Sequence, residues 1–333
     1  MMKGFLLTVL ISLLFLTSAS CSGNYFTHNG EIWGTTYHIV YQNGQNIDNE
    51  LDSIMRYVDA ELSMFNPASL VSAINSGESD SISVAFAEVF DIASRVSRLS
   101  GGVYDPTVGP LTELWGFGRS AAETLPSSAE ISEALSAVGI SECQIEGYRI
   151  IKKAPATLFD FSSVAKGYGI DLVCRHLESR GADNYMVEIG GEVRTLGRNP
   201  RGRDWHIQID MPRPDTAHSR LAIVSFGPEG KAIASSGNYR NFRKRTDGSI
   251  YGHTLSAVSG YPVESELAAV TVIADDCAAA DALATACMAS GNAGHAMRII
   301  EAWPGAEMLA VIAKADTAVV LTSAGFNSYL ADI

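Results

Sequence analysis

Apolar residues recur along parts of the chain with the 3.6-residue period of a helix. Residues 84–99 show this spacing and are followed by Gly101 and Gly102, which favour a helix end. Ser127 and Glu130 have the spacing of a capping box, which predicts the start of another helix. The helices predicted in this way cover residues 49–62, 84–99, 127–138, 168–178 and 276–290.

Short runs of β-branched and apolar residues predict strands, most of them in the second half of the chain. The predicted strands cover residues 34–41, 156–159, 186–189, 192–196, 205–210, 220–226, 232–235, 268–274, 311–313 and 318–321. Strands therefore outnumber helices after residue 183. Together, the predicted helices and strands indicate a mixed α/β chain without repeats. Neither the loop 197–203 nor the segment 212–215 has the composition of an interdomain linker.

The first residues have the pattern of a signal peptide. A positively charged start precedes an apolar run, residues 4–16, that is too short to span a bilayer comfortably, and small residues then precede Cys21. We expect residues 1–20 to be a lipoprotein signal peptide, Cys21 to carry a lipid anchor, 21–30 to be a tether and 31–333 to form the functional domain. The protein would then be lipid-anchored to a cell-envelope membrane, facing the periplasm. An uncleaved membrane anchor and a soluble secreted form are the alternatives.

The net charge bears on the class of partner, and the cysteine spacing bears on disulfides. The net charge is −13, and no basic run exceeds residues 240–245, which argues against nucleic acid as a partner. The cysteines that follow Cys21 lack CxxC spacing and lie in apolar contexts. They are interpreted as buried free thiols, and a disulfide between two of them remains open. These cysteines are Cys143, Cys174, Cys277 and Cys287.

Residues 160–171 combine an acid, small residues and a lysine at a predicted strand-to-helix turn. A helix N-terminus presents backbone N–H groups and partial positive charge, so it suits a phosphate. Lys166 would add a point charge for the same anion. The alternative is an ordinary turn with a surface lysine.

The helix predicted at 276–290 is almost wholly small and apolar, except for Asp281 and Thr285. These two stand four residues apart and therefore share a helix face. A carboxylate in apolar surroundings must be paired or bind a metal, and hard oxygen ligands suit Mg²⁺. The alternative is a Thr285 hydroxyl bonded back along its helix and an Asp281 paired with a basic residue.

Glycines and prolines in residues 101–118 predict an irregular loop in which Tyr104 and Trp115 offer flat aromatic surfaces. The alternative is a rigid turn whose aromatic residues belong to the core.

Read in order, these clusters resemble the ApbE-type FAD:protein FMN transferases, bacterial flavin transferases of the cell envelope. The resemblance runs from about Trp33 to about Leu330. The matching pieces are Trp33-Gly-Thr-Thr-Tyr37, Leu62-Ser-Met-Phe-Asn-Pro-Ala-Ser69 with Ile74-Asn75, Gly102 to Leu111 with Leu114-Trp-Gly-Phe-Gly118, Asp160 to Asp171, Glu188-Ile-Gly-Gly-Glu192, Ser235 to Arg240, His253-Thr-Leu255 and Asp281-Ala-Leu-Ala-Thr285.

The resemblance implies an α+β (mixed α/β) fold with mixed or antiparallel sheets flanked by helices, and it implies roles for particular residues. FAD would be bound by Trp33, Phe65, Val103, Tyr104, Asp105, Asp160, Lys166 and Leu255. Mg²⁺ would be held by Asp281 and Thr285, with backbone oxygens near Ser163 and Ala284. Lys166 and His253 would be catalytic, with His253 as the candidate proton acceptor.

The sequence departs from the family pattern in places. Trp33 stands where the family usually has Met, and Ser256-Ala257 follows the His253 triplet where an aspartate-proline pair is common. Ser162-Ser163 replaces a pair that commonly contains glycine, and Ser235-Ser236 only approximates its counterpart.

The implied reaction is Mg²⁺-dependent transfer of FMN from FAD to a Thr or Ser hydroxyl of an envelope protein, such as a redox-pump subunit, with release of AMP. An FAD pyrophosphatase that uses water as acceptor, and a non-catalytic flavin-binding lipoprotein, are the alternatives. Asp281 and Thr285 favour the two enzymes over the binding protein, whereas nothing in the sequence separates transferase from hydrolase.

Overall fold

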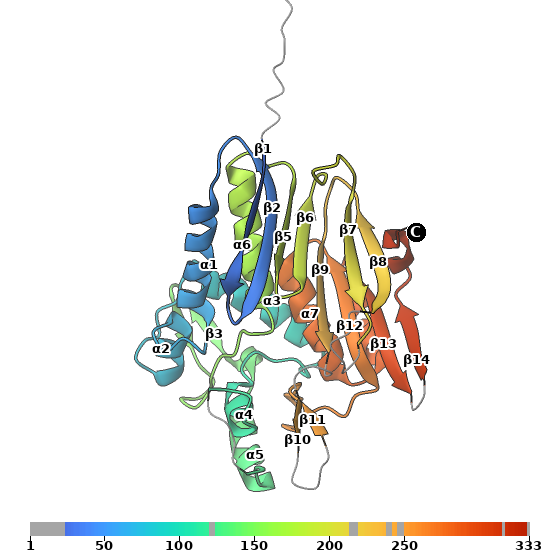
Figure 1. Ribbon diagram of the computed structural model, residues 1–333. Coiled ribbons are helices and arrows are strands. Elements are labelled where there is room, and N and C mark those ends of the chain that lie inside the picture. The colour runs from blue at the N-terminus through green and yellow to red at the C-terminus, as the bar shows by residue number, and fades with distance from the viewer. Residues whose placement is uncertain are drawn as a thin grey trace, which may run out of the picture.

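An eight-stranded sheet runs through the molecule and organises the other elements (Figure 1). The computed structural model describes residues 24–119, 124–212, 219–237, 242–244, 250–314 and 317–331. Every neighbouring pair of strands in this sheet is antiparallel. In spatial order the strands are β1 (Asn24–Ile32), β2 (Thr35–Asn43), β5 (Tyr185–Ile189), β6 (Glu192–Leu196), β9 (Ala232–Gly237), β12 (Leu267–Ala274), β13 (Glu307–Lys314) and β14 (Thr317–Thr322).

Helices cover one face of this sheet and bury the largest apolar cluster. Helix α7 (Cys277–Ser290), which is apolar apart from Asp281, Thr285 and Ser290, packs against β9 and β12, and α6 (Ala165–Ser179) packs against β5 and β6. Val270 and Val272 of β12 point into this helical side, whereas Ile273 belongs to the cluster on the opposite face, as the two-residue period of a strand requires. The outer helices are α1 (Asp48–Leu62), α2 (Leu70–Ser76), α3 (Val84–Leu99) and α8 (Ala293–Glu301).

The opposite face of the sheet is covered by a hairpin of β7 (Trp205–Asp210) and β8 (Arg220–Phe226), together with the short helix η2 (Phe326–Tyr329). A smaller lobe lies at one end of the sheet, below it in Figure 1. Its elements include α4 (Gly109–Leu114), α5 (Ser128–Ser136), β10 (Phe242–Lys244) and β11 (Ile250–Gly252). Nearby are η1 (Ile140–Glu142) and the hairpin of β3 (Gln144–Glu146) with β4 (Arg149–Ile151).

The predicted fold class is confirmed, and so are the predicted helices to within a few residues at each end. The capping box at Ser127 and Glu130 is present, and Gly291 ends α7 in the left-handed conformation. The strand predicted at 156–159 is wrong. Its backbone instead bonds to the Asn75 side chain through Phe159, and Leu158 makes a single isolated bridge to Val108.

The tether predicted at residues 21–30 is wrong from Asn24 onward, because β1 begins there and pairs with β2 along its whole length. The predicted signal peptide and Cys21 lie outside the described residues. Cys143, Cys174, Cys277 and Cys287 are buried free thiols, which settles the open disulfide question for these four. Within the described part of the chain, no helix has the length and apolar character needed to cross a membrane.

Candidate active site

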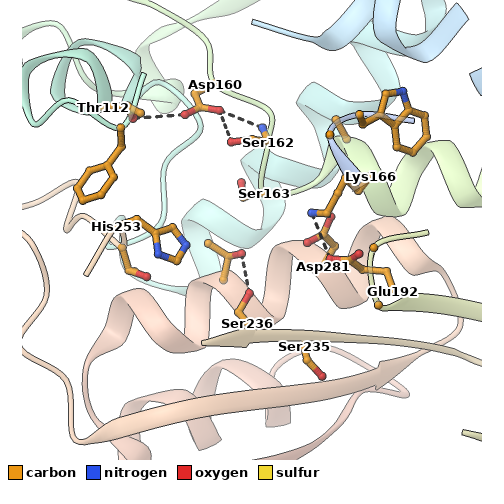
Figure 2. Close-up of a pocket in the computed structure, with 18 of the residues that line it drawn as sticks. Thr112, Asp160, Ser162, Ser163, Lys166, Glu192, Ser235, Ser236, His253 and Asp281 are labelled. Carbon is orange, nitrogen blue, oxygen red and sulfur yellow. Dashed lines mark hydrogen bonds and ion pairs between the residues drawn. The ribbon is translucent and has the colours of Figure 1, made fainter. Parts of the chain in front are cut away.

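A cavity of about 1300 Å³ lies where the end of the sheet faces the α4–α5 lobe. Most of the residues expected to bind FAD or metal line this cavity, although they come from segments far apart in the sequence (Figure 2). They are Trp33, Phe65, Tyr104, Asp105, Asp160, Ser163, Lys166, His253, Leu255, Asp281 and Thr285. Val103 and Ala284 are not among the lining residues; Ala284 is fully buried within α7, and the Val103 carbonyl accepts a hydrogen bond from the Ala257 N–H.

Helices α6 and α7 both line the cavity, α6 with its first turn and α7 with residues from Asp281 onward, and they cap each other's N-terminal ends. Asp171 of α6 accepts hydrogen bonds from the N–H groups of Cys277 (3.0 Å) and Ala278 (2.9 Å) at the start of α7. Asp281 of α7 accepts one from the Gly167 N–H (3.1 Å) in the first turn of α6. The first N–H groups of a helix have no acceptor within that helix, so each carboxylate supplies the missing acceptor at the start of the other helix. One N–H expected to face a phosphate is therefore already occupied.

This mutual capping requires the two helices to approach closely. A Cβ on Gly167 would lie 2.3 Å from the Cys277 carbonyl oxygen, which is closer than atoms can pack. Glycine at this position therefore brings the first turn of α6 against α7, and it places Lys166 beside Asp281.

Lys166 lies between two buried carboxylates at the centre of the cavity (Figure 2). Its Nζ is 3.1 Å from Glu192 Oε1 and 3.8 Å from Asp281 Oδ2. Burial tends to lower the pKa of Lys166, but the Asp281 and Glu192 carboxylates outweigh burial and raise that pKa above its usual value. The lysine is therefore positively charged at neutral pH, as a phosphate ligand must be.

Glu192 is a site residue whose role no motif in the sequence indicated. Burial raises the pKa of its carboxyl group to about 7; Lys166 opposes this shift and the Asp281 charge adds to it. The available signal was its place as an acid directly after Gly190-Gly191, within a segment that matched the family.

Asp281 and Thr285 both face the cavity from α7, and their oxygens are hard ligands of the type that Mg²⁺ prefers. The Thr285 hydroxyl lies 3.2 Å from the Ser236 hydroxyl of β9. No group of three or more His, Cys, Asp or Glu side chains arranged to hold a metal occurs among the described residues. A cation held here would therefore take few ligands from protein side chains. This arrangement fits Mg²⁺, which usually completes its shell with water and substrate phosphate.

The turn before α6 is held rigid by Asp160. Its Oδ1 accepts hydrogen bonds from the Ser162 N–H (3.0 Å) and hydroxyl (2.5 Å), and its Oδ2 accepts one from Thr112 (3.3 Å). The Ser163 hydroxyl donates to Tyr104 Oη at 3.1 Å, and burial raises the pKa of that phenol. These side chains form a polar wall whose geometry is set by internal hydrogen bonds.

Asp105 lines the cavity, but its carboxylate holds the surrounding loop together. Its Oδ1 accepts hydrogen bonds from the Thr107 N–H and hydroxyl, and its Oδ2 accepts one from the Ile140 N–H. Burial raises the pKa of Asp105, and these hydrogen bonds oppose the shift. Its geometry indicates a structural contribution to the wall.

Aromatic side chains flank the polar centre. Trp33 has a φ of +52°, the one positive value at a non-glycine residue in the described part of the chain, and its indole N–H donates to the Met55 carbonyl. Its ring packs where Gly169 has no side chain, since a Cβ there would lie 2.2 Å from the indole. Phe65 is 52% exposed, and the Phe117 ring makes an edge contact with His253. Flat surfaces of this kind suit a planar ring system.

Comparison with known proteins shows which family this chain resembles. The ApbE family model matches residues 33–310. A Vibrio cholerae (serotype O1) protein named FAD:protein FMN transferase is 36% identical over 296 residues, which cover 86% of this chain and 87% of the relative. A protein of the same name from Haemophilus influenzae is 34% identical over 280 residues, covering 79% of this chain and 80% of the relative.

Solved structures agree with the sequence comparisons. The flavin transferase ApbE from Vibrio cholerae superposes with a TM-score of 0.82 at 33% identity, covering 92% of this chain and 99% of that one. The apo flavinyl transferase ApbE of Pseudomonas stutzeri also gives a TM-score of 0.82, at 32% identity, covering 94% of this chain and 99% of that one. On both kinds of evidence, this chain belongs to the ApbE family.

Proposed function

We propose that this protein is an FAD:protein FMN transferase, which moves FMN from FAD to a Thr or Ser hydroxyl of an envelope protein and releases AMP. The observation that carries the proposal is that Lys166, Asp281 and Thr285 face a single cavity together with the aromatic side chains of Trp33 and Phe65. A dinucleotide needs both a charged centre for its pyrophosphate and flat walls for its rings. The relatives with this name support the same activity.

The proposed step is a phosphoryl transfer in which one bond to phosphorus forms and one breaks. The acceptor hydroxyl oxygen bonds to the phosphorus of the FMN half, and the bond from that phosphorus to the bridging oxygen breaks. AMP leaves with the bridging oxygen, and the hydroxyl proton passes to a base. Such reactions depend mainly on positioning and charge neutralisation.

The residues in the cavity have distinct parts in this proposal. Lys166 would bind a phosphate oxygen through its ammonium group, and His253 is the candidate base for the acceptor proton. Asp281 and Thr285 would hold Mg²⁺, which when bound supplies further charge neutralisation at the phosphate oxygens. Asp160 and Tyr104 would fix the wall against which the dinucleotide lies.

The acceptor and the cellular address belong to the proposal as well. Acylation of Cys21 would hold the enzyme at an envelope membrane, facing the periplasm, where subunits of membrane redox pumps could serve as acceptors. An FAD pyrophosphatase would use the same residues with water in place of the hydroxyl. A flavin-binding protein without catalysis would keep the aromatic walls but would not need the metal ligands Asp281 and Thr285.

The test is incubation of the protein with FAD, Mg²⁺ and an acceptor protein co-expressed as a candidate substrate, followed by mass spectrometry. A gain equal to FMN on a Thr or Ser, with matching release of AMP, is expected. Accumulation of AMP and free FMN with no gain on any acceptor would replace the transferase by the pyrophosphatase. Lys166→Ala should slow transfer strongly while FAD still quenches protein fluorescence, because the aromatic walls remain.

A further inference from the structure

Lys166 is placed unequally between its two carboxylates. The ammonium lies within hydrogen-bonding distance of Glu192 Oε1 at 3.1 Å, whereas its 3.8 Å separation from Asp281 Oδ2 is an ion pair without a hydrogen bond (Figure 2). Lysine is a flexible point charge, so a move of about 1 Å would bring it into direct contact with Asp281. The contact with Glu192 opposes this movement of the ammonium group toward Asp281.

The backbone around Glu192 holds its carboxylate in position. Glu192 is the first residue of β6, and it follows Gly190 (φ +65°) and Gly191 (φ +98°), a turn that other residues rarely adopt. A Cβ on Gly190 would lie 2.9 Å from the Thr35 side chain, so the turn is packed tightly against β2. The Glu192 side chain is only 7% exposed, which leaves it little freedom to turn away from Lys166.

We propose that Glu192 is a positioning residue that holds Lys166 away from Asp281 and so keeps the Asp281 carboxylate open to a divalent cation. Without Glu192, the ammonium would close on Asp281 and compete with the cation for the same oxygen. With Glu192 in place, the lysine keeps a hydrogen-bonded partner while Asp281 takes the metal. This inference rests on the proposed Mg²⁺ dependence of the enzyme.

A second role for Glu192 makes a different prediction. Its Oε2 is buried, with no hydrogen-bond partner in the described part of the chain, so Glu192 could instead act on the cation directly, as a ligand or through its charge. The two roles differ in whether Lys166 is needed. An effect that passes through Lys166 must vanish when Lys166 is replaced, whereas a direct effect must persist.

The experiment is a double-mutant cycle on Mg²⁺ binding, measured by calorimetric titration of the full-length protein in the absence of FAD. Glu192→Gln should weaken binding about tenfold, the size expected when an ammonium approaches a carboxylate by about 1 Å in a partly buried site. Lys166→Met should bind Mg²⁺ at least as tightly as the wild type, because the competing charge is gone. In the Lys166→Met background, Glu192→Gln should change the affinity less than about twofold.

Glu229→Gln is the matched control, since it removes one carboxylate charge at an exposed turn between β8 and β9 and should leave Mg²⁺ affinity unchanged. Thermal unfolding of each metal-free variant shows whether it is folded. If Glu192→Gln does not fold, Glu192→Asp serves instead, because its shorter side chain keeps the charge but retracts the carboxylate from Lys166, and binding should again weaken.

Each outcome separates this inference from the proposed function. Equal Mg²⁺ affinity in wild type and Glu192→Gln would overturn the positioning role and leave the metal-dependent reaction intact. An equal loss in both backgrounds would show that Glu192 acts on the cation directly, and would also overturn it. Failure of the wild type to bind Mg²⁺ at all would overturn the inference and the metal part of the proposed function together.

Discussion

Asp171 and Asp281 each cap the helix on which the other lies, so that one carboxylate of α6 closes the start of α7 and one carboxylate of α7 closes the start of α6. Asp171 also pairs with Arg194 of β6, at 2.5 Å from Nη1 to Oδ1. The same contact that satisfies both helix ends therefore fixes the relative position of Lys166 and Asp281.

We expect Asp171→Ala to lower the free energy of unfolding by about 3 kcal/mol, because it leaves the partly buried Arg194 with only the exposed Asp276, 3.5 Å away, as its ion-pair partner, and two N–H groups of α7 without their acceptor. Urea unfolding followed by circular dichroism measures this loss. Asp91→Ala, on the exposed side of α3, is the control and should change stability by less than about 0.5 kcal/mol. A comparable loss in both variants would contradict the structural role of Asp171.

Asp281 has a structural part that its apolar surroundings in the sequence did not indicate, since it accepts the Gly167 N–H. Asp281→Asn keeps an oxygen for that hydrogen bond, whereas Asp281→Ala removes it, so the alanine variant should be the less stable by about 1 kcal/mol. Both variants should lose the rise in melting temperature caused by Mg²⁺ and should lose FMN transfer. A normal Mg²⁺ response in either variant would show that the metal lies elsewhere.

Gly167→Ala should destabilise the protein by about 2 kcal/mol or more and reduce transfer, because the new Cβ would collide with the Cys277 carbonyl and push α6 away from α7. Chemical denaturation together with the transfer assay tests both effects. Gly227→Ala is the matched control: its Cβ would meet nothing within 4 Å, and its φ is not in the left-handed region. If the two variants behave alike, the close approach of the helices does not matter for the site.

The stability of the protein should depend on pH through Glu192. Burial raises the pKa of Glu192 from 4.5 to about 7, so between these values the unfolded chain has released a proton that the folded protein still holds. The contribution of Glu192 to stability is therefore fully present below pH 4.5 and is lost as the pH rises through 7. In metal-free buffer, the melting temperature of Glu192→Gln should rise relative to wild type between about pH 5 and about pH 8. A constant difference over this range would argue against the raised pKa.

If Cys21 carries the proposed lipid anchor, the full-length protein should fractionate with membranes. Cys21→Ser should leave the chain unprocessed or release it into the soluble fraction, since the acyl chains would be missing. Membrane fractionation with immunodetection and intact-mass measurement tests this. A processed Cys21→Ser chain that stays membrane-associated as before would rule out the lipid anchor.

Local patterns in the sequence were sufficient to predict the helices that are stabilised by contacts between residues close together in the chain. The apolar period of residues 84–99 predicted α3 at its observed bounds, and the capping box at Ser127 predicted the start of α5, because both signals depend on neighbours within a turn or two. The order of the motifs was enough to indicate the family. The family pattern in turn predicted that most of the site residues share one cavity.

Other features depended on contacts between distant segments. Residues 156–159 have the composition of a strand, yet the Asn75 side chain takes the hydrogen bonds that a neighbouring strand would have provided. Strand β1 is half exposed at the sheet edge, so its apolar alternation is weak, and only its pairing with β2 makes it a strand.

The charged centre was decided by the tertiary structure. The sequence indicated that Lys166 and Asp281 were important, but it assigned no role to Glu192 and did not indicate that two helix ends would exchange carboxylates. An ion pair or a cap between residues more than a hundred positions apart, such as Gly167 and Asp281, leaves no periodic trace in either segment. Its strength depends on distance and burial, and both quantities exist only once the sheet and the helices have packed together.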